Sequence, residues 1–181
     1  GNFQFRERLP ELRVARRAGV VMPSVCVIMD RFIGDFDAER RRDAIENMKS
    51  LISVIAEAGG QGAITPAAFG LHSNSLPPFR SPRTPEEDRQ VLMEGLQELG
   101  EHARREGVTV YLEPLNRYED HMLHTLEQAV DLCKAVGLPS VKVMGDLFHM
   151  SIEEANLADS IRRAGDYLVH MHLADSNRAQ P

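Results

Sequence analysis

The chain has 181 residues, which is enough for one domain with a sizeable core, and nothing in its composition marks a second domain. Its net charge is −6 and its pI is near 5.6, and its arginines do not interleave with aromatic residues, so we expect no nucleic-acid partner. Cys26 and Cys133 fit small buried apolar positions better than a disulfide, and without a signal peptide or a long apolar run we expect a cytoplasmic chain that does not enter a membrane.

Predicted helices and strands alternate along the whole chain, with short turns and no low-complexity linker between them. This alternation is typical of a parallel α/β fold. The expected helices cover residues 6–18, 38–58, 84–107, 125–136 and 151–165. The expected strands cover residues 20–29, 62–66, 108–113, 141–146 and 167–172.

The best-marked helix begins at Thr84. Thr84, Pro85 and Glu87 supply an N-cap, a first-turn proline and a capping-box partner. Apolar residues recur at helical spacing from Leu92 onward, and Gly107 ends the pattern.

Ser151 and Glu154 form another capping-box pattern, which predicts a last helix that closes near Gly165. Between the second strand and the Thr84 helix lies LHSNSLPPFRSPR, at residues 71–83. Its proline density excludes regular structure there.

Three successive predicted strands end on a residue that can bind a metal: VTVYLE at Glu113, VKVMGD at Asp146 and YLVHMH at His172. The carboxyl ends of parallel barrel strands converge on one face, so these side chains can meet around one ion. Two carboxylates and an imidazole suit Mn²⁺, Co²⁺, Mg²⁺ or Zn²⁺ and argue against a thiolate site. Taken singly, each residue is better explained as a loop cap, an N-cap or a packed histidine, but three equivalent positions together favour a metal site.

Three further residues are candidates near the same strand ends. His149 follows Asp146 by three residues and is either a hydrogen-bond donor to a substrate or a turn residue. Arg178 is either a fixed cation for a substrate oxygen or solvated surface, and Glu119 is either a substrate-binding carboxylate or an exposed loop charge.

The remaining histidines fit ordinary positions. His170 is expected to pack one layer below the strand ends. The histidines expected in loops or on the surface are His72, His102, His121 and His124.

The blocks LEPLNRYED, DLFHMSIEE and HMHLADSNR carry these candidates. They resemble three consecutive signature segments of the xylose isomerase-like TIM barrels, in particular the sugar epimerases and isomerases that include tagatose and psicose 3-epimerases. The resemblance implies a partial (β/α) TIM barrel, with parallel strands ringed by helices. It would form one domain over residues 1–181 and lack the first one or two strands and the eighth.

The resemblance also implies roles for the residues. Glu113, Asp146 and His172 would bind a divalent metal, Mn²⁺ or Co²⁺ before Mg²⁺ or Zn²⁺, and Glu113 would also be the catalytic proton-transfer base. The substrate-binding positions implied are Glu119, His149 and Arg178.

Two departures from the family pattern are visible. Leu147 stands where relatives commonly have a threonine after the aspartate. The family's fourth metal ligand is a glutamate of the eighth strand, which also acts as the second acid/base, and it would fall after Pro181.

The implied function is that of a metal-dependent sugar isomerase or epimerase, which transfers a proton next to a carbonyl through an enediolate. With Glu113 as its one base, this chain alone is expected to be inactive or impaired. An alternative is a non-catalytic partial barrel that self-associates. An apurinic-site endonuclease ranks below both, since the sequence offers neither the required Asp-x-His element nor a basic DNA face.

Open sheet edges are expected near residues 20–29 and 167–172, and both segments are apolar. Unpaired edges of this kind invite a second chain. We therefore expect a homodimer as the protein partner. The expected small-molecule partner is a sugar, and the lack of a glycine-rich phosphate loop favours one without a phosphate group.

Overall fold

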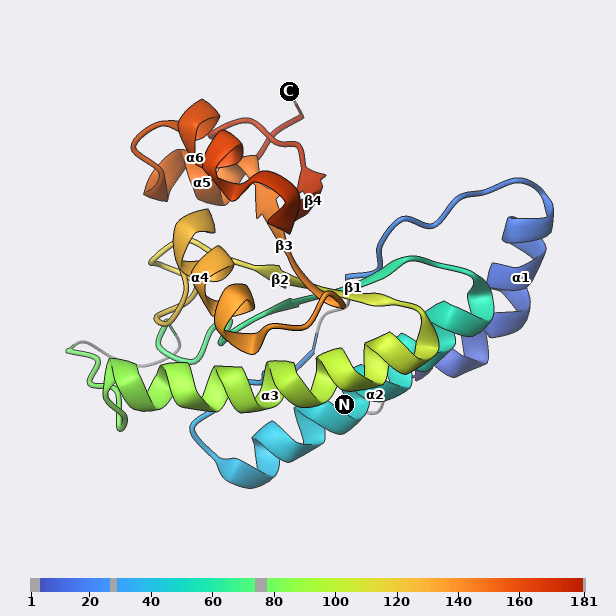
Figure 1. Cartoon of the computed structure of the whole chain (residues 1–181), viewed down its shortest axis with the longest axis horizontal. Helices are drawn as coiled ribbons and strands as arrows, with labels where there is room; N and C mark the ends of the chain where they lie inside the picture. The colour runs from blue at the N-terminus through green and yellow to red at the C-terminus, as the bar shows by residue number, and fades with distance from the viewer. Residues whose placement is uncertain (1–3, 27–28, 74–77, 181) are drawn as a thin grey trace.

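The computed structural model describes residues 4–26, 29–73 and 78–180. Its centre is a four-stranded parallel sheet in which the strands lie in chain order (Figure 1). The strands are β1 (Gly62–Pro66), β2 (Thr109–Glu113), β3 (Val141–Asp146) and β4 (Leu168–His172). The predicted α/β class with parallel, sequentially ordered strands is confirmed, and this order is that of a β/α barrel wall.

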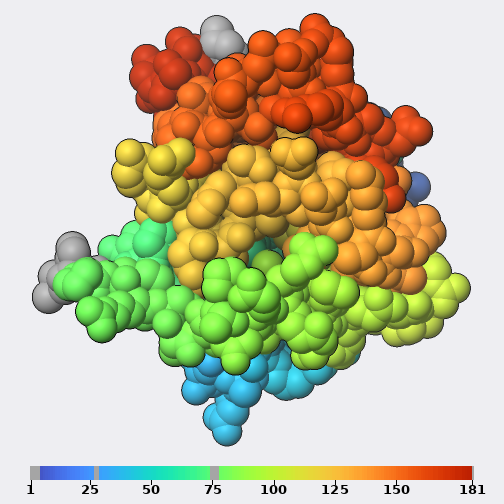
Figure 2. Space-filling model, turned by 60° about the vertical axis from the view of Figure 1, so that its left-hand side comes forward, coloured from blue at the N-terminus to red at the C-terminus, as the bar shows by residue number. Residues whose placement is uncertain are grey.

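Helices precede and connect the strands. A 3-10 turn, η1 (Gln4–Arg8), leads into α1 (Leu9–Arg17), and Figure 1 shows the long α2 (Ala38–Ala58) and α3 (Pro85–Glu106) side by side below the sheet. The remaining helices are α4 (Leu126–Val136), α5 (Leu147–Glu153), α6 (Leu157–Ala164) and the 3-10 turn η2 (Gly165–Tyr167). In Figure 2 the surface colours run mainly in chain order from blue to red across the molecule, because each element packs beside its neighbours in sequence. None of the helices in the described ranges combines the length and the apolar character needed to cross a bilayer.

The sheet has two differently packed faces. Val110 and Leu112 alternate with Tyr111 along β2, and both belong to the large core between sheet and helices. Tyr111 lies on the opposite, barrel-interior face, where it forms a small cluster with Ile64 and Met144. The strand alternation that builds the core therefore also points every second residue of β2 toward the barrel axis.

The strand β4 contains an irregularity at Val169. Val143 of β3 pairs with Leu168, and the next residue, Met144, pairs with His170. Val169 therefore has no partner in the register, and it is 45% exposed. Leu168 and Met171 both pack against the large core, although residues three apart in a regular strand face opposite sides. The extra residue thus changes which face the following side chains occupy.

The helix signals around α3 are confirmed. The backbone N–H of Glu87 donates to Thr84 Oγ1 at 3.2 Å, and the backbone N–H of Thr84 donates to Glu87 Oε2 at 2.7 Å, which is a complete capping box. Gly107 ends the helix with a φ of 71°, a left-handed conformation that favours glycine.

The predicted strand at residues 20–29 is not formed in its described part. Only Val25 pairs, in a single parallel bridge with Ala63, through hydrogen bonds to Gly62 O and from Ile64 N, each 2.9 Å long. Pro23 has no N–H to donate two residues earlier, which opposes a regular ladder. Residues 27–28 lie outside the described residues.

The predicted single helix over 151–165 is also wrong, because α5 and α6 are separate. Asp146 caps α5 by accepting from the backbone N–H of Phe148 at 2.8 Å, so α5 starts before Ser151. Glu154 does not close a capping box. Its carboxylate accepts from Leu126 N and Ser160 Oγ instead, and the chain is extended there.

Candidate metal and sugar site

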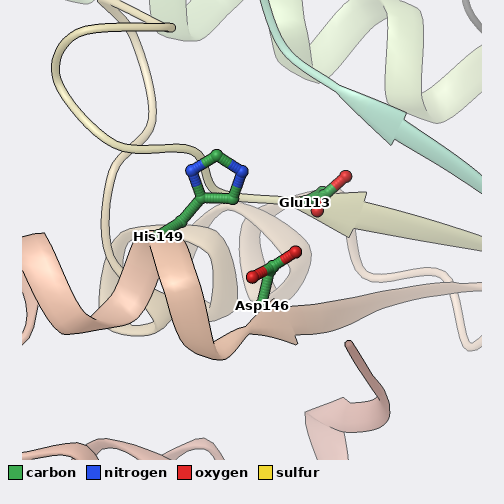
Figure 3. A group of neighbouring side chains, drawn as sticks. All are labelled: Glu113, Asp146 and His149. Carbon is green, nitrogen blue, oxygen red and sulfur yellow. The ribbon is translucent and has the colours of Figure 1, made fainter. Parts of the chain in front are cut away.

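Carboxylates end two neighbouring strands and face an imidazole from the next helix. Glu113 is the last residue of β2, Asp146 is the last of β3, and His149 belongs to the first turns of α5. One potential ligand atom from each lies within 4.8 Å of the other two. Figure 3 shows the polar ends of the three side chains facing the same space. Glu113 and Asp146 therefore converge at the carboxyl ends of their strands, and the third residue of this compact group is His149, where the sequence indicated His172.

His172 joins this group from β4, where the parallel register places it beside Asp146. Its Nδ1 lies 3.5 Å from Asp146 Oδ2 and 3.7 Å from Glu113 Oε1. The contacts with Asp146 and then Glu113 raise the pKa of His172 to about 9. Burial acts to raise the pKa of Asp146, but His172 and the N–H of Phe148 together lower it below its usual value.

The donor set fits a divalent cation. Glu113 is buried and, in the described part of the chain, its one charged neighbour within ion-pair distance is His172. A buried carboxylate is costly unless a cation compensates for its charge. Two carboxylates and an imidazole at one point offer the oxygen and nitrogen ligands that Mn²⁺, Co²⁺, Mg²⁺ and Zn²⁺ accept.

Arg178 and Glu119 form the polar wall of the site. Arg178 Nη1 donates to Glu119 Oε1 at 3.0 Å, and the guanidinium lies 4.6 Å from the ring centroid of Phe148. Arg178 has a φ of 66° and is the one non-glycine residue with a positive φ among those described. Backbone strain of this kind is retained where the surrounding structure fixes it, and it marks Arg178 as a functional candidate.

All six predicted site residues line one cavity of about 260 Å³. They are Glu113, Glu119, Asp146, His149, His172 and Arg178. The remaining lining is largely apolar and includes Met29, Phe32 and Phe69. A few convergent polar groups in a mostly apolar cavity are typical of a small-molecule site.

A larger cavity, of about 540 Å³, lies beside the first turns of α3 and α4. His121 and Asp88 line it, and the expected loop position of His121 is confirmed although its side chain is only 9% exposed. Arg83 already donates to Asp88 at 2.6 Å, so the strongest charges there satisfy each other. We therefore place the candidate site at the strand ends.

Asn116 is a site residue that the sequence reasoning missed. It is 1% exposed and its amide Nδ2 lies 2.7 Å from His149 Nδ1 and 3.3 Å from Glu119 Oε1. Its place between Glu113 and Glu119 in LEPLNRYED was the available signal, but an asparagine after a strand is also common in plain turns.

Parallel strands in chain order, outer helices and ligand-type side chains at the carboxyl ends are the arrangement found in β/α barrels, whose enzymes carry their active sites at these strand ends. The family model described as "Xylose isomerase-like TIM barrel" matches residues 10–181, and the chain belongs to this family. The resemblance seen in the three sequence blocks is thus confirmed.

Proteins named as sugar epimerases are among the relatives that the chain matches. The chain is 40% identical over 174 residues to 3-dehydro-D-guloside 4-epimerase of Escherichia coli (strain K12), a match that covers 96% of this chain and 66% of that protein. It is 43% identical over 112 residues to D-psicose 3-epimerase of Enterocloster bolteae, covering 62% of this chain and 37% of the relative. The solved apo structure of 3-keto-D-glucoside 4-epimerase from E. coli superposes with a TM-score of 0.92 at 39% identity, over 97% of this chain and 67% of that one. The chain therefore spans about two thirds of the length of the E. coli epimerase and a little over a third of the length of the E. bolteae epimerase.

Proposed function

We propose that this chain forms most of the catalytic site of a metal-dependent sugar epimerase or isomerase, which moves a proton at a carbon next to a carbonyl group. The observation that carries the proposal is the single cavity in which Glu113, Asp146 and His172 meet Glu119 and His149. Membership in a family whose matched relatives are sugar epimerases supports the same reaction class.

We assign the divalent ion to Glu113, Asp146 and His172. The Nδ1 of His172 lies within 3.7 Å of both carboxylates, so one cation could replace its proton. Mn²⁺ or Co²⁺ suits this mixed set, with Mg²⁺ or Zn²⁺ as alternatives. A bound ion would supply positive charge that polarises a carbonyl oxygen and its neighbouring hydroxyl.

The other roles belong to the protein's own side chains. Glu113 ends β2 as a buried carboxylate facing the cavity, and we assign it the removal or return of the carbon-bound proton. Arg178 and Glu119, held together at 3.0 Å, would orient sugar hydroxyls, and His149 would donate a hydrogen bond to a substrate oxygen. The apolar residues of the cavity would limit the access of water.

The substrate class proposed is a ketose or a keto-glycoside without a phosphate group. The matched relatives carry the names of a 3-dehydro-guloside epimerase and a psicose epimerase, and both substrates contain a carbonyl next to a carbon that bears a hydroxyl group. Apart from His172, which is assigned to the ion, the strongly basic side chain of the described cavity is Arg178, which already pairs with Glu119. That pairing favours a neutral polyhydroxyl ligand over an anion.

Metal binding can be tested by calorimetric titration of the chain with Mn²⁺ and Co²⁺. We expect one site per chain, lost in Glu113→Gln and in His172→Ala. Glu127→Gln is the matched control, because Glu127 is 69% exposed and neither it nor its ion-pair partner Arg163 lines the cavity. Binding that is absent from the unmodified chain, or equal in all variants, would contradict the assignment.

Proton transfer can be tested separately by NMR in deuterated buffer with D-psicose or D-fructose and excess Mn²⁺. One base at one face of the sugar can exchange a proton with solvent without completing an epimerisation, which requires a second base. We therefore expect deuterium to enter next to the carbonyl with little or no net conversion by this chain. The exchange should disappear in Glu113→Gln and persist in Glu127→Gln, and exchange that survives Glu113→Gln would remove Glu113 from its proposed role.

A further inference from the structure

Asn116 connects the two substrate-facing sides of the site. The residue is 1% exposed, on the loop that follows β2. Its side-chain Nδ2 lies 2.7 Å from His149 Nδ1 and 3.3 Å from Glu119 Oε1, and Glu119 in turn accepts from Arg178. One buried amide therefore contacts His149 directly and Arg178 through Glu119.

The backbone fixes which way the Asn116 amide points. The N–H of Tyr118 donates to Asn116 Oδ1 at 2.9 Å, and a backbone N–H can only donate. The amide oxygen must therefore face Tyr118, and the amide NH₂ must face His149 and Glu119. Both of its hydrogens then have an acceptor.

The same reasoning fixes the proton of the His149 ring. Two donors face its Nδ1: the Asn116 amide NH₂ at 2.7 Å and the Asn116 backbone N–H at 3.2 Å. A hydrogen on Nδ1 would point at both donors, so Nδ1 carries the lone pair and the neutral ring carries its hydrogen on Nε2. Figure 3 shows one ring nitrogen on the side of Glu113 and Asp146 and the other on the opposite side.

We propose that Asn116 is a positioning residue that holds His149 as its Nε2–H tautomer, so that His149 donates a hydrogen bond into the cavity and does not bind the ion. A ring nitrogen that carries a hydrogen has no lone pair for a metal, although His149 lies within ligand distance of Glu113 and Asp146. This separates the two histidines of the site: His172 is left to ligate and His149 to recognise substrate oxygen. The inference rests on the proposed function for that recognition, but the tautomer itself follows from the contacts alone.

The test is NMR of the chain with ¹⁵N-labelled histidine, using long-range ¹H–¹⁵N correlations that distinguish the protonated from the unprotonated ring nitrogen. His149 is assigned through the loss of its signals in His149→Gln. In the unmodified, metal-free chain we expect the Nε2–H tautomer of His149. An Nδ1–H tautomer there would overturn the proposal without any variant being made.

Asn116→Asp is the decisive variant, because it replaces the donor that faces Nδ1 by an acceptor of the same shape. We expect Nδ1 to gain a hydrogen, either by a change of tautomer or as the second hydrogen of an imidazolium that pairs with the new carboxylate. An Nδ1 that stays unprotonated in a folded Asn116→Asp chain would show that the Asn116 side chain does not set the tautomer. Asn156→Asp is the matched control, since Asn156 caps α6 by accepting from Asp159 N and aspartate caps as well as asparagine does.

Addition of Zn²⁺, which is diamagnetic, separates this inference from the proposed function. We expect the Nδ1 signal of His172 to change on binding, while His149 keeps its hydrogen on Nε2. Loss of the His149 Nε2 hydrogen on Zn²⁺ binding would overturn the proposal. If Zn²⁺ changes no histidine, the metal assignment fails, and the metal-free tautomer still decides the role of Asn116.

Discussion

Asp120 accepts a hydrogen bond from the backbone N–H of Ala68 at 2.8 Å, although the two residues lie on loops that follow different strands. The other oxygen of the same carboxylate accepts from the N–H of Met122 at 2.7 Å. Asp120 has no exposed surface, so it ties the loop after β1 to the loop that carries Asn116 and Glu119.

Replacing Asp120 by alanine should therefore destabilise the chain strongly. The buried N–H of Ala68 and the partly buried N–H of Met122 would lose a carboxylate acceptor, and we expect the free energy of unfolding to fall by about 3 kcal/mol. Urea denaturation followed by circular dichroism measures this change. Asp131→Ala is the control, because Asp131 is 61% exposed and should change the stability by less than about 0.5 kcal/mol. Equal effects of the two substitutions would contradict the role given to Asp120.

The metal-free chain should lose stability as the pH rises toward 9. The carboxylates of Asp146 and Glu113 raise the pKa of His172 from 6.5 to about 9, so the stabilisation is complete below pH 6.5 and is lost as the pH rises through about 9. Thermal unfolding between pH 6 and 10 in the presence of a chelator should show this decline. His172→Gln should flatten it, and a decline of the same size in that variant would assign the effect to another group.

Metal affinity should change in the opposite direction over the same pH range. The ion must displace the proton of His172, so below pH 9 the affinity for Mn²⁺ should rise up to about tenfold for each pH unit. Calorimetry in two buffers of different ionisation enthalpy at pH 7.5 should detect close to one proton released per ion. Release of no proton would mean that His172 is not a ligand.

An ion-pair network between α2 and α3 should contribute modestly to stability. Glu98 accepts from Arg42 through two bonds of 2.8 Å and also pairs with Lys49, and these contacts lower the pKa of Glu98 to about 2. Its stabilisation is present above pH 4.5 and is lost as the pH falls through about 2. Because Glu98 is 37% exposed, solvent weakens the effect, and Glu98→Gln should cost about 1 kcal/mol at pH 7.

The control for that substitution is Glu101→Gln. Glu101 pairs only with Arg104, three residues away on the same helix, within the described contacts. We expect a cost of about 0.3 kcal/mol, measured by urea denaturation at pH 7. A loss for Glu98→Gln that does not exceed the loss for Glu101→Gln would show that the link between helices adds nothing.

Gly62 leaves room for an aromatic ring of the barrel interior. A Cβ at this position would lie 2.2 Å from the Cε2 and Cζ atoms of Tyr111, whose ring stacks on His170 with centroids 5.6 Å apart. Gly62→Ala should displace the ring and lower the free energy of unfolding by about 1–3 kcal/mol. Gly95→Ala, inside α3, meets its nearest neighbour at 3.5 Å and should stabilise the chain by about 0.5–1 kcal/mol. Chemical denaturation of each variant measures its free energy of unfolding. A Gly95→Ala chain that is less stable than the Gly62→Ala chain would contradict this account.

The homodimer stays a prediction, and the exposed apolar residues favour it. Val20 and Val21 are 57% and 74% exposed at one side of the sheet, and Val169 and Leu173 are 45% and 68% exposed at the other. We expect light scattering at micromolar concentration to give twice the mass of the chain. Leu173→Lys should shift the equilibrium toward the monomer, because a charge would enter the apolar contact. A monomeric unmodified chain that binds no hydrophobic dye would contradict the prediction.

The features that were predicted correctly follow from local sequence patterns, either directly or through the regular pairing of parallel strands. The capping box of Thr84 and Glu87 forms because its partners are three residues apart, and Glu113, Asp146 and His172 meet because parallel pairing aligns strand ends. The pattern of alternating elements was therefore enough for the fold class and for the place of the candidate site.

The wrong and missing predictions depend on side-chain partners that neither a local pattern nor strand pairing specifies. Glu154 accepts a hydrogen bond from the backbone N–H of Leu126, the first residue of another helix. It therefore does not form the capping box with Ser151 that their spacing predicted. Asn116 acquires its place through His149, 33 residues away, and such a contact leaves no periodic pattern. Val25 pairs through a single bridge with Ala63. The apolar sequence around Val25 predicts a strand, but the length of a strand also depends on the residues that it packs against.

The unpaired Val169 is a β-bulge that reverses the alternation of side chains along the strand. Residues before it follow one alternation of inside and outside, and residues after it follow the other, so His170 and His172 point into the barrel although Leu168 points out. The length of β4, and not only its composition, thus determines which side chains reach the cavity. Deletion of Met171 would turn His172 away from the cavity, although the strand would remain largely apolar.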